Sequence, residues 1–198
     1  VVGCGGLGGY IIEILARAGV GALTVVDGDV FDATNLNRQL LCDETVLGTN
    51  KAKVAASRVF SVNSNVSVTA VQEFLTAENA GDILKGCDLA VDALDSAQAR
   101  RVLAAACAGK SLRLVHGAIS GWGAQVTVVA PCSGVFDKLY PLRASNAPKK
   151  GNLSFMAAVC ASVQACEAVK LLIGRPSPLL GKLLLMDLKS MDFKQIDI

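Results

Sequence analysis

The first eight residues, Val1-Val2-Gly3-Cys4-Gly5-Gly6-Leu7-Gly8, decide the fold. They contain the pattern G-x-G-x-x-G at Gly3, Gly5 and Gly8, with a β-branched pair before it and helical periodicity over Leu7–Ala18 after it. Glycines in this arrangement allow a tight turn and a close approach of phosphate, and the start of the helix offers unpaired N–H groups. The stretch predicts a strand, a nucleotide-binding loop and a helix. The alternative is that the glycines only let strand and helix pack closely.

A carboxylate follows this loop at the distance typical of dinucleotide-binding folds. Asp27 ends the apolar run Leu23–Val26, about 20 residues after Gly8. At the end of a strand, such a carboxylate can accept hydrogen bonds from ribose hydroxyls. Taken alone, the loop and the acid indicate NAD as the ligand.

Short β-branched runs alternate with longer helical patterns through the first part of the chain. This alternation predicts a Rossmann-like, doubly wound α/β domain, whose mostly parallel sheet carries helices on both faces. We expect strands at Leu23–Val26, Val66–Val71, Leu89–Ala93 and Leu112–His116, and helices at Leu7–Ala18, Asn50–Val62, Ala77–Leu84 and Ala97–Ala108.

The pattern changes in the last third of the chain. Gly123–Ala130 is rich in valine and predicts an antiparallel extension of the sheet, which a hairpin of Leu183–Met186 and Met191–Ile196 would complete. Pro131–Asn152 contains three of the five prolines and is expected to form a loop. Leu153–Ile173 is expected to form one long core helix, ended by the glycine that follows it.

Length and composition suit one folded domain over residues 1–198. Hydrophobic residues make up 52% of the chain and charged residues 18%, which excludes disorder as the main state. The net charge of +2 makes nucleic acid an unlikely partner. The mean hydropathy of +0.47 suggests an additional buried face, such as a subunit interface. We expect no membrane span, since a run such as Val102–Ala108 is far shorter than the ~20 residues required.

The cysteines indicate the redox compartment of the protein, and the first residue indicates whether the chain continues upstream. The chain has seven cysteines, an odd number, and no C-x-x-C pair. This favours a reducing cytoplasm without a disulfide framework. Because Val1 already lies in an expected strand and is not Met, we expect further residues upstream of it.

Charged residues beyond the glycine loop argue against NAD. Arg38, Lys51 and Asp95 all lie at or after expected strand ends, which line one crevice in a doubly wound sheet. Two cations and a carboxylate suit a triphosphate with Mg²⁺, whereas NAD carries only a diphosphate. Each residue also has a structural alternative. Arg38 could form a surface ion pair, Lys51 could be a solvated helix residue, and Asp95 or Asp92 could cap the following helix.

Together these motifs resemble the ubiquitin-activating (E1-like) family, in particular the bacterial HesA/MoeB/ThiF group. The matching segments run in order over nearly the whole chain: Gly3–Gly8, Leu23–Asp29, Asn35–Gln39, Gly48 with Lys51, Asp92–Asp95, His116–Ala118 and Val163–Lys170. Members of this group adenylate the C-terminal glycine of ubiquitin-like sulfur carrier proteins. The resemblance implies the same reaction here, with ATP and Mg²⁺ as cofactors and pyrophosphate as the leaving group.

The resemblance also implies roles for individual residues. Arg38, Lys51 and Asp95 would be catalytic, and Asp95 would hold Mg²⁺. The partner would be a carrier ending in Gly-Gly, and the assembly a homodimer whose second subunit often supplies an arginine from a preceding segment. The implied nucleotide-binding set comprises Gly3, Gly5, Gly6, Gly8, Asp27, Asp29, Thr34, Asn35, Leu36, Asn37, Arg38, Gln39, Lys51, Asp95 and Ser96.

Two departures from the group concern cysteine. Many members hold a structural zinc with two C-x-x-C pairs, but here Pro131-Cys132-Ser133-Gly134-Val135 has a single cysteine, so we expect no zinc. Some members form a thioester or persulfide on a cysteine in the loop that corresponds to Tyr140–Phe155, which has none here. We therefore expect adenylation only, with Cys132, Cys160 and Cys166 as core or loop-edge residues.

Three rival functions remain. An NAD-dependent oxidoreductase leaves Arg38, Lys51 and Asp95 without a task and has only His116 as a histidine acid–base group. An E1-like dehydratase acting on a modified tRNA base keeps ATP but changes the substrate. A non-catalytic E1-like scaffold would bind a ubiquitin-like fold without turnover. His116 is expected to be a hydrogen-bonded core residue, while Trp122 and Lys149–Lys150 have no assigned role.

Overall fold

Val1 and Val2 lie inside the sheet, between two longer strands. The computed structural model describes residues 1–141 and 151–198. Its helices are α1 (Gly6–Ala18), α2 (Lys51–Val62), α3 (Ala80–Ile83), α4 (Ala97–Gly109), α5 (Val135–Leu139) and α6 (Ser154–Leu172). Its strands are β1 (Ala22–Val26), β2 (Ser67–Val71), β3 (Leu89–Asp92), β4 (Arg113–Ser120), β5 (Gly123–Val129), β6 (Lys182–Asp187) and β7 (Asp192–Asp197).

A single residue joins the two halves of the sheet. Val2 forms parallel bridges to Val26 of β1 and to Asp92 of β3. The strand order is therefore β2, β1, the Val2 segment, β3, β4, β5, β6 and β7. Pairing is parallel for β1 with β2 and for β3 with β4, and antiparallel from β4 through β7. The prediction of a parallel sheet with an antiparallel C-terminal extension is confirmed.

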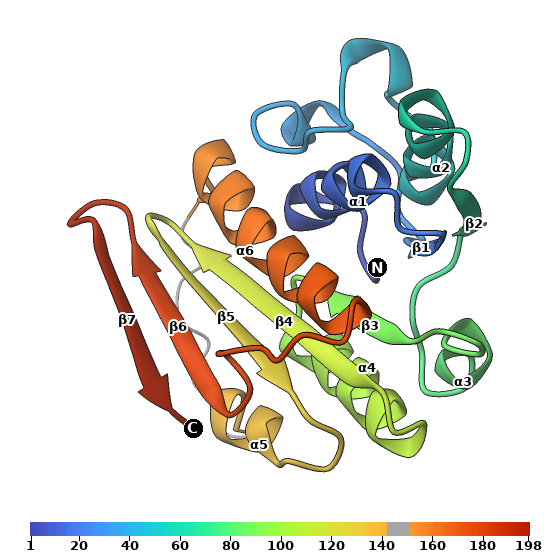
Figure 1. Cartoon of the computed structure of the whole chain (residues 1–198). Helices are drawn as coiled ribbons and strands as arrows, with labels where there is room; N and C mark the ends of the chain where they lie inside the picture. Colours follow the sequence, from blue (N-terminus) through green and yellow to red (C-terminus); the bar gives the residue numbers. More distant parts are fainter. Residues whose placement is uncertain (142–150) are drawn as a thin grey trace.

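Two hydrophobic cores, one on each face, make the sheet doubly wound. Successive strand residues point to opposite faces, so Val25 and Val91 join one core while Val26 and Ala90 join the other. The first core is covered by α1, α2 and α6, and the second by α3, α4 and α5. Figure 1 shows α6 in front of β4 and α4 behind it. This arrangement leaves the carboxyl ends of the parallel strands at one edge.

Among the described residues, α6 alone is long and apolar enough to span a membrane by length and composition. The sequence argument from Val102–Ala108 overlooked this helix. However, α6 packs along α1, β4 and β5, and its polar residues Gln164 and Glu167 are buried. These are the contacts of a core helix, as expected for Leu153–Ile173.

Three elements differ from their predicted bounds. β4 does not end at His116 but continues to Ser120, because Gly117 gives room to the side chain of Gln164 on α6. The α5 helix lies within the expected loop. Its first residues, Val135 and Phe136, are buried in the second core, which can hold a short helix that local propensity does not predict. The expected helix Ala77–Leu84 is reduced to the single turn of α3.

Candidate functional site

The glycine loop requires glycine where it passes β3. Gly3 has φ +95°, and a Cβ atom there would lie 2.6 Å from the carbonyl oxygen of Ala93. Gly5 is the N-cap of α1 and makes no side-chain capping bond, so the first turn of α1 offers N–H groups without a side-chain acceptor. A Cβ atom at Gly6 would meet only open space. This loop can therefore receive an anionic group at a helix N-terminus.

Asp27 is fixed beside this loop at the end of β1. Its two carboxylate oxygens accept hydrogen bonds from the N–H groups of Cys4 and Asp29, at 2.7 and 2.9 Å. Each oxygen has a further lone pair, so the carboxylate can still accept a hydroxyl proton. The geometry agrees with the predicted ribose-binding role of Asp27.

Lys51 is buried in an ion pair at the start of α2. Its Nζ atom lies 2.6 Å from Oδ2 of Asp29, and its side chain is only 7% exposed, whereas that of Asp29 is 51% exposed. The Lys51 ammonium holds the pKa of Asp29 below its usual range. The alternative that Lys51 is a solvated helix residue is wrong. An ammonium has three N–H donors, so two remain for a phosphate.

Arg38 is held by its own loop rather than by an acid. Its Nη1 atom donates to the carbonyl oxygen of Thr34 at 2.8 Å and to Oδ1 of Asn37 at 2.9 Å. Within residues 1–141 and 151–198 it makes no ion pair, so the surface ion-pair alternative finds no support there. Asn35 is buried and its Oδ1 accepts the N–H of Asp32, whereas Leu36 is exposed.

Gln39 lies directly under the glycine loop. It is buried, and a Cβ atom at Gly5 would lie 3.6 Å from its Nε2. Its Oε1 is buried and has no hydrogen-bond partner among the described residues. A buried amide oxygen without a partner costs stability, and its position at the loop is consistent with the predicted contribution of Gln39 to nucleotide binding.

The turn after β3 carries the last two predicted residues. Asp95 is exposed, and its carboxylate makes no hydrogen bond or ion pair with any part of the chain that the structure describes. Ser96 caps α4, because its Oγ accepts the N–H of Ala99 at 3.2 Å. Neither Asp95 nor Asp92 is the cap. The turn adjoins the glycine loop, since Gly3 packs on Ala93.

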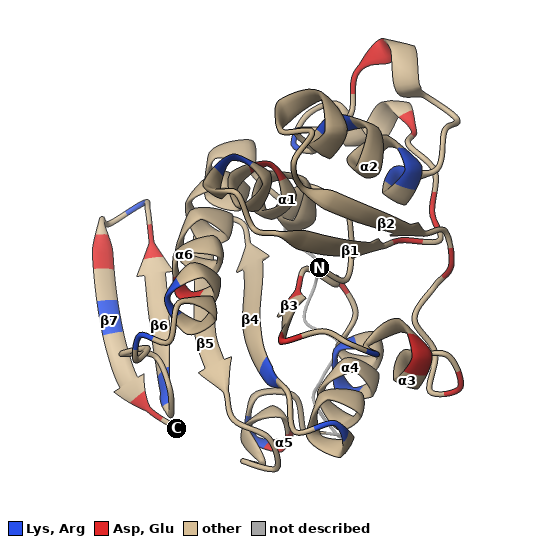
Figure 2. Ribbon diagram, turned by 45° about the vertical axis from the view of Figure 1, so that its right-hand side comes forward, with Lys and Arg blue, Asp and Glu red and all other residues tan. Residues whose placement is uncertain are grey.

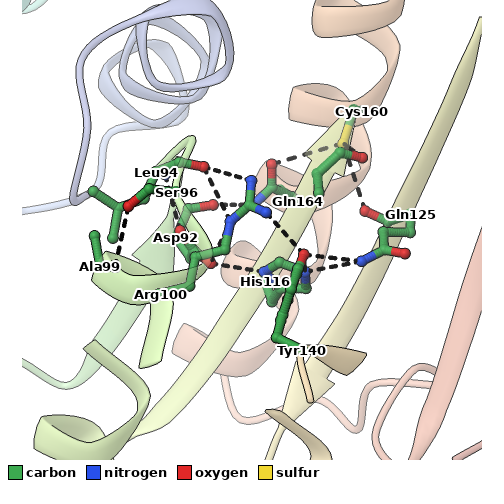
Figure 3. Close-up of polar contacts among 11 residues, drawn as sticks. Asp92, Leu94, Ser96, Ala99, Arg100, His116, Gln125, Tyr140, Cys160 and Gln164 are labelled. Atoms are coloured by element: carbon green, nitrogen blue, oxygen red, sulfur yellow. Dashed lines mark hydrogen bonds and ion pairs between the residues drawn. The ribbon is translucent and has the colours of Figure 1, made fainter. Parts of the chain in front are cut away.

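A buried cluster behind this turn, which the sequence argument did not foresee, is formed by Asp92, Arg100, His116 and Tyr140 (Figure 3); we call it the polar ring. Asp92 and His116 are fully buried, and Nδ1 of His116 lies 2.7 Å from Oδ2 of Asp92. Nε2 of His116 lies 3.0 Å from the Tyr140 hydroxyl, which also accepts Nη1–H of Arg100 at 2.9 Å. His116 is thus the core histidine that was expected, but in mid-strand.

The polar ring left weak signals in the sequence. Asp92 is a lone acid at the end of an apolar strand, and His116 is the only histidine. Each of these residues is far along the chain from its partner, so no local spacing links them. Trp122, another residue without an assigned role, packs against Phe155 with ring centroids 5.1 Å apart. Lys149–Lys150 lie outside the described residues.

The cysteines Cys107 and Cys160 are buried in the folded chain. Burial raises the pKa of the Cys107 and Cys160 thiols to about 12, which leaves both uncharged near neutral pH. Cys132 lies exposed in the loop after β5, and Cys166 is exposed on α6 rather than in the core. Residues 1–141 and 151–198 contain no group of three or more His, Cys, Asp or Glu that could hold a metal ion.

The site is therefore built on the sheet edge where the Val2 segment, β1 and β3 end. It joins an anion-binding loop, a fixed carboxylate at Asp27, a buried ammonium at Lys51 and an exposed carboxylate at Asp95. These features define a nucleotide-binding α/β domain with charges suited to a polyphosphate.

Comparison with known proteins assigns the family. The ThiF family model matches residues 1–198, and the chain belongs to this family. It is 37% identical to the SAMP-activating enzyme E1 of Haloferax volcanii, over 99% of this chain and 74% of that protein. It is 38% identical to the sulfur carrier protein adenylyltransferase of Thermus thermophilus, over 100% of this chain and 77% of that protein.

Solved structures agree with the fold. The structure of Escherichia coli MccB with ATP superposes with a TM-score of 0.81 at 22% identity, covering 99% of this chain. The chain spans 61% of that protein. The predicted family is confirmed, and the names of the relatives agree with an adenylyltransferase of the ThiF and MoeB type rather than with an NAD-dependent oxidoreductase.

Proposed function

We propose that this chain adenylates the C-terminal glycine carboxylate of a ubiquitin-like sulfur carrier protein, with ATP as the second substrate and pyrophosphate as the product. The observation that carries the proposal is the meeting of the glycine loop, Asp27 and the Asp95 turn at one sheet edge. The names of the relatives, which include sulfur carrier protein adenylyltransferases, support the same substrate class.

Nucleotide binding follows from the charges of the site. The ribose hydroxyls would donate to Asp27, and the phosphates would lie along the first turn of α1, whose partial positive charge favours anions. Lys51 and Arg38 would supply cationic N–H donors to the phosphate oxygens. Because Lys51 is already fixed by Asp29, little reorganisation is needed when the phosphate arrives.

Asp95 is the residue that we propose for Mg²⁺. Mg²⁺ is typically held by one or two carboxylates together with substrate phosphates and water, so an exposed carboxylate near the phosphate loop fits this ion. When bound, Mg²⁺ would screen the charge of the triphosphate and favour departure of pyrophosphate. The exposed side chain of Asp95 has no other partner among the described residues, which leaves it available for this role.

The carrier's C-terminal tail needs a path to the α-phosphorus. A cavity of about 540 Å³ is lined by Arg100, Tyr140 and Gln125, together with residues of β4, β5, β6 and β7. Arg100 connects it to the Asp95 turn, because its Nε donates to the carbonyl oxygen of Leu94. A tail of two glycines is slender enough for such a cavity. The carboxylate would attack the α-phosphorus directly, so this step needs no protein nucleophile.

We further propose a homodimer located in the cytoplasm. The mean hydropathy of +0.47 and exposed apolar side chains such as Phe60 and Phe193 support a subunit interface. All seven cysteines are free, as in a reducing compartment. Figure 2 shows acidic and basic residues interspersed along β7. Light scattering of the purified protein would test the dimer.

Exchange of labelled pyrophosphate into ATP tests the proposed reaction. We expect exchange that depends on Mg²⁺ and on a small carrier ending in Gly-Gly, and none when the terminal glycine of that carrier is removed. Turnover with modified tRNA alone would favour the dehydratase, and ATP binding without exchange would favour the scaffold. A carrier adduct that survives denaturation would contradict the expectation of adenylation without a thioester.

A further inference from the structure

Both polar backbone groups of Leu94, the residue before Asp95, are held by side chains. Its N–H donates to Oδ1 of Asp92 at 2.9 Å. Its carbonyl oxygen accepts two bonds from Arg100, from Nε at 3.1 Å and from Nη2 at 2.6 Å. The backbone from which Asp95 projects is thus fixed, while the Asp95 carboxylate itself has no partner in the described part of the chain.

Arg100 is in turn fixed by Tyr140. Nη1 of Arg100 donates to the Tyr140 hydroxyl at 2.9 Å, and the guanidinium lies over the tyrosine ring, 5.2 Å from its centroid. The hydroxyl also accepts Nε2–H of Gln125 at 3.1 Å. Since a phenol oxygen accepts two bonds and donates one, its proton is directed to Nε2 of His116.

This pattern of donors closes the polar ring. With Nε2 of His116 accepting, Nδ1–H donates to Asp92, and the second oxygen of Asp92 holds the N–H of Leu94. Every polar atom of the ring that faces the interior therefore has a partner. Gln164 on α6 adds a bond from its Nε2 to the carbonyl oxygen of Asp92 at 2.8 Å, which ties β3 to the core helix (Figure 3).

Stability alone is a weak reason for such a cluster. Burial of Asp92 and Arg100 costs desolvation energy, and well-packed apolar residues often replace buried ion pairs without loss of stability. A satisfied polar network does, however, fix geometry more strictly than apolar contacts do. The ring holds the backbone of Leu94 in place. Because Leu94 directly precedes Asp95, the ring can set the position of Asp95 in the site.

We propose that Arg100 and Tyr140 are positioning residues, which hold the Leu94 backbone so that the Asp95 carboxylate points at the nucleotide phosphates. The Tyr140 hydroxyl is central to this arrangement, because it forms hydrogen bonds with Arg100, Gln125 and His116. The inference deepens the proposed function and rests on it in one respect, the role of Asp95 toward Mg²⁺.

The test compares Tyr140→Phe with Tyr10→Phe. The first change deletes the central hydroxyl but keeps the ring that packs against Phe136. The second deletes the hydroxyl that contacts Oγ of Ser154, at the only other tyrosine. In the protein without ligands, we expect the Leu94 amide to exchange its hydrogen about tenfold faster in Tyr140→Phe, and at the wild-type rate in Tyr10→Phe.

A second readout connects the ring to Asp95. In pyrophosphate exchange, Tyr140→Phe should lower kcat about tenfold and raise the Mg²⁺ concentration for half-maximal rate, with little change in the KM for ATP. When Asp95 is already Asn, Tyr140→Phe should cause almost no further loss, because both changes act through one carboxylate. Losses that multiply in the double variant, or an unchanged Leu94 exchange rate, would overturn the proposal.

Arg100→Lys is the second test variant, to be used if Tyr140→Phe does not fold. Lysine keeps the positive charge but cannot form hydrogen bonds with Leu94 and Tyr140 at the same time in the way that arginine does. The same acceleration of Leu94 exchange is expected, and its absence counts against the proposal. Hydrogen exchange needs neither ATP nor carrier. A wild-type protein without any pyrophosphate exchange would therefore refute the proposed function, while the Leu94 comparison would still decide whether the ring holds this turn.

Discussion

Asp92 and Asp95 are close neighbours at the end of β3, yet their surroundings are opposite. Asp92 is fully buried and is held by His116, the Leu94 N–H group and, at 3.8 Å, Arg100. Asp95 is exposed and has no partner among the residues that the structure describes. In one short segment the chain thus carries a carboxylate committed to structure and a carboxylate available for chemistry.

The difference shows how such a site divides its tasks. A carboxylate that binds Mg²⁺ and phosphate must stay solvated and unpaired until the ligand arrives, so its direction must be set by something else. The polar ring can supply that direction because it is buried and fully hydrogen-bonded. The following changes test the contrast, from the largest expected effect to the smallest.

Asp92→Ala should affect stability most. It leaves His116 and Arg100 buried without their carboxylate, which typically costs about 3–5 kcal/mol when one partner of a buried pair is removed. Urea unfolding followed by circular dichroism would measure the loss. A free energy of unfolding within about 1 kcal/mol of wild type would show that the ring contributes little to folding.

Asp95→Ala should lower activity and leave stability unchanged, the opposite of the main effect of Asp92→Ala. Because the side chain is exposed and has no partner within residues 1–141 and 151–198, the melting temperature should not change. Pyrophosphate exchange should fall by about 100- to 1000-fold. Asp92→Ala is a matched control, since both changes remove one carboxylate from the same segment. If Asp95→Ala exchanged pyrophosphate at the wild-type rate, the proposed role of Asp95 as a Mg²⁺ ligand would be wrong.

Gly117→Ala tests the tie between β4 and α6. A Cβ atom there would overlap the side-chain amide of Gln164, which donates to the carbonyl oxygen of Asp92. Overpacking of this kind typically costs about 1–3 kcal/mol. Gly21→Ala is the control, because a Cβ atom there meets nothing within 4 Å. Equal thermal stabilities of the two variants would argue against tight packing at Gly117.

Glu13→Gln should have the smallest effect, confined to acid pH. Hydrogen bonds from Arg58, and then from Arg17, hold the pKa of Glu13 below its usual range. A lowered pKa in the folded state adds stability above the pKa of the unfolded chain, and this stability is lost as pH falls through the folded value. The variant should lose less than about 1 kcal/mol at pH 7. Near pH 3 the difference from wild type should shrink; a constant difference would contradict the assignment.

The half of the site near the glycine loop could be predicted because its signals are local. The glycine spacing, the strand that ends at Asp27 and the helix that starts at Lys51 follow from neighbouring residues, and their bounds agree with α1, β1 and α2 to within a residue or two. The family resemblance supplied roles for Arg38 and Asp95 that spacing alone does not give. These individual roles stay predictions.

The polar ring and α5 could not be predicted in the same way. Tyr140 lies next to α5, a single turn stabilised by the burial of Val135 and Phe136 against the second core, and such tertiary stabilisation leaves no periodic pattern. The extension of β4 past His116 depends on Gln164 from α6, far away in the sequence. Contacts of this kind appear only once the sheet is assembled.

A crystal structure of the protein with Mg²⁺ and a non-hydrolysable ATP analogue tests the central claim most directly. We predict the ribose at Asp27, the phosphates between the glycine loop and Lys51, and a carboxylate oxygen of Asp95 at about 2.0–2.1 Å from the metal ion or bonded to one of its waters. A nucleotide bound elsewhere, or an Asp95 carboxylate turned away from the phosphates, would contradict the account.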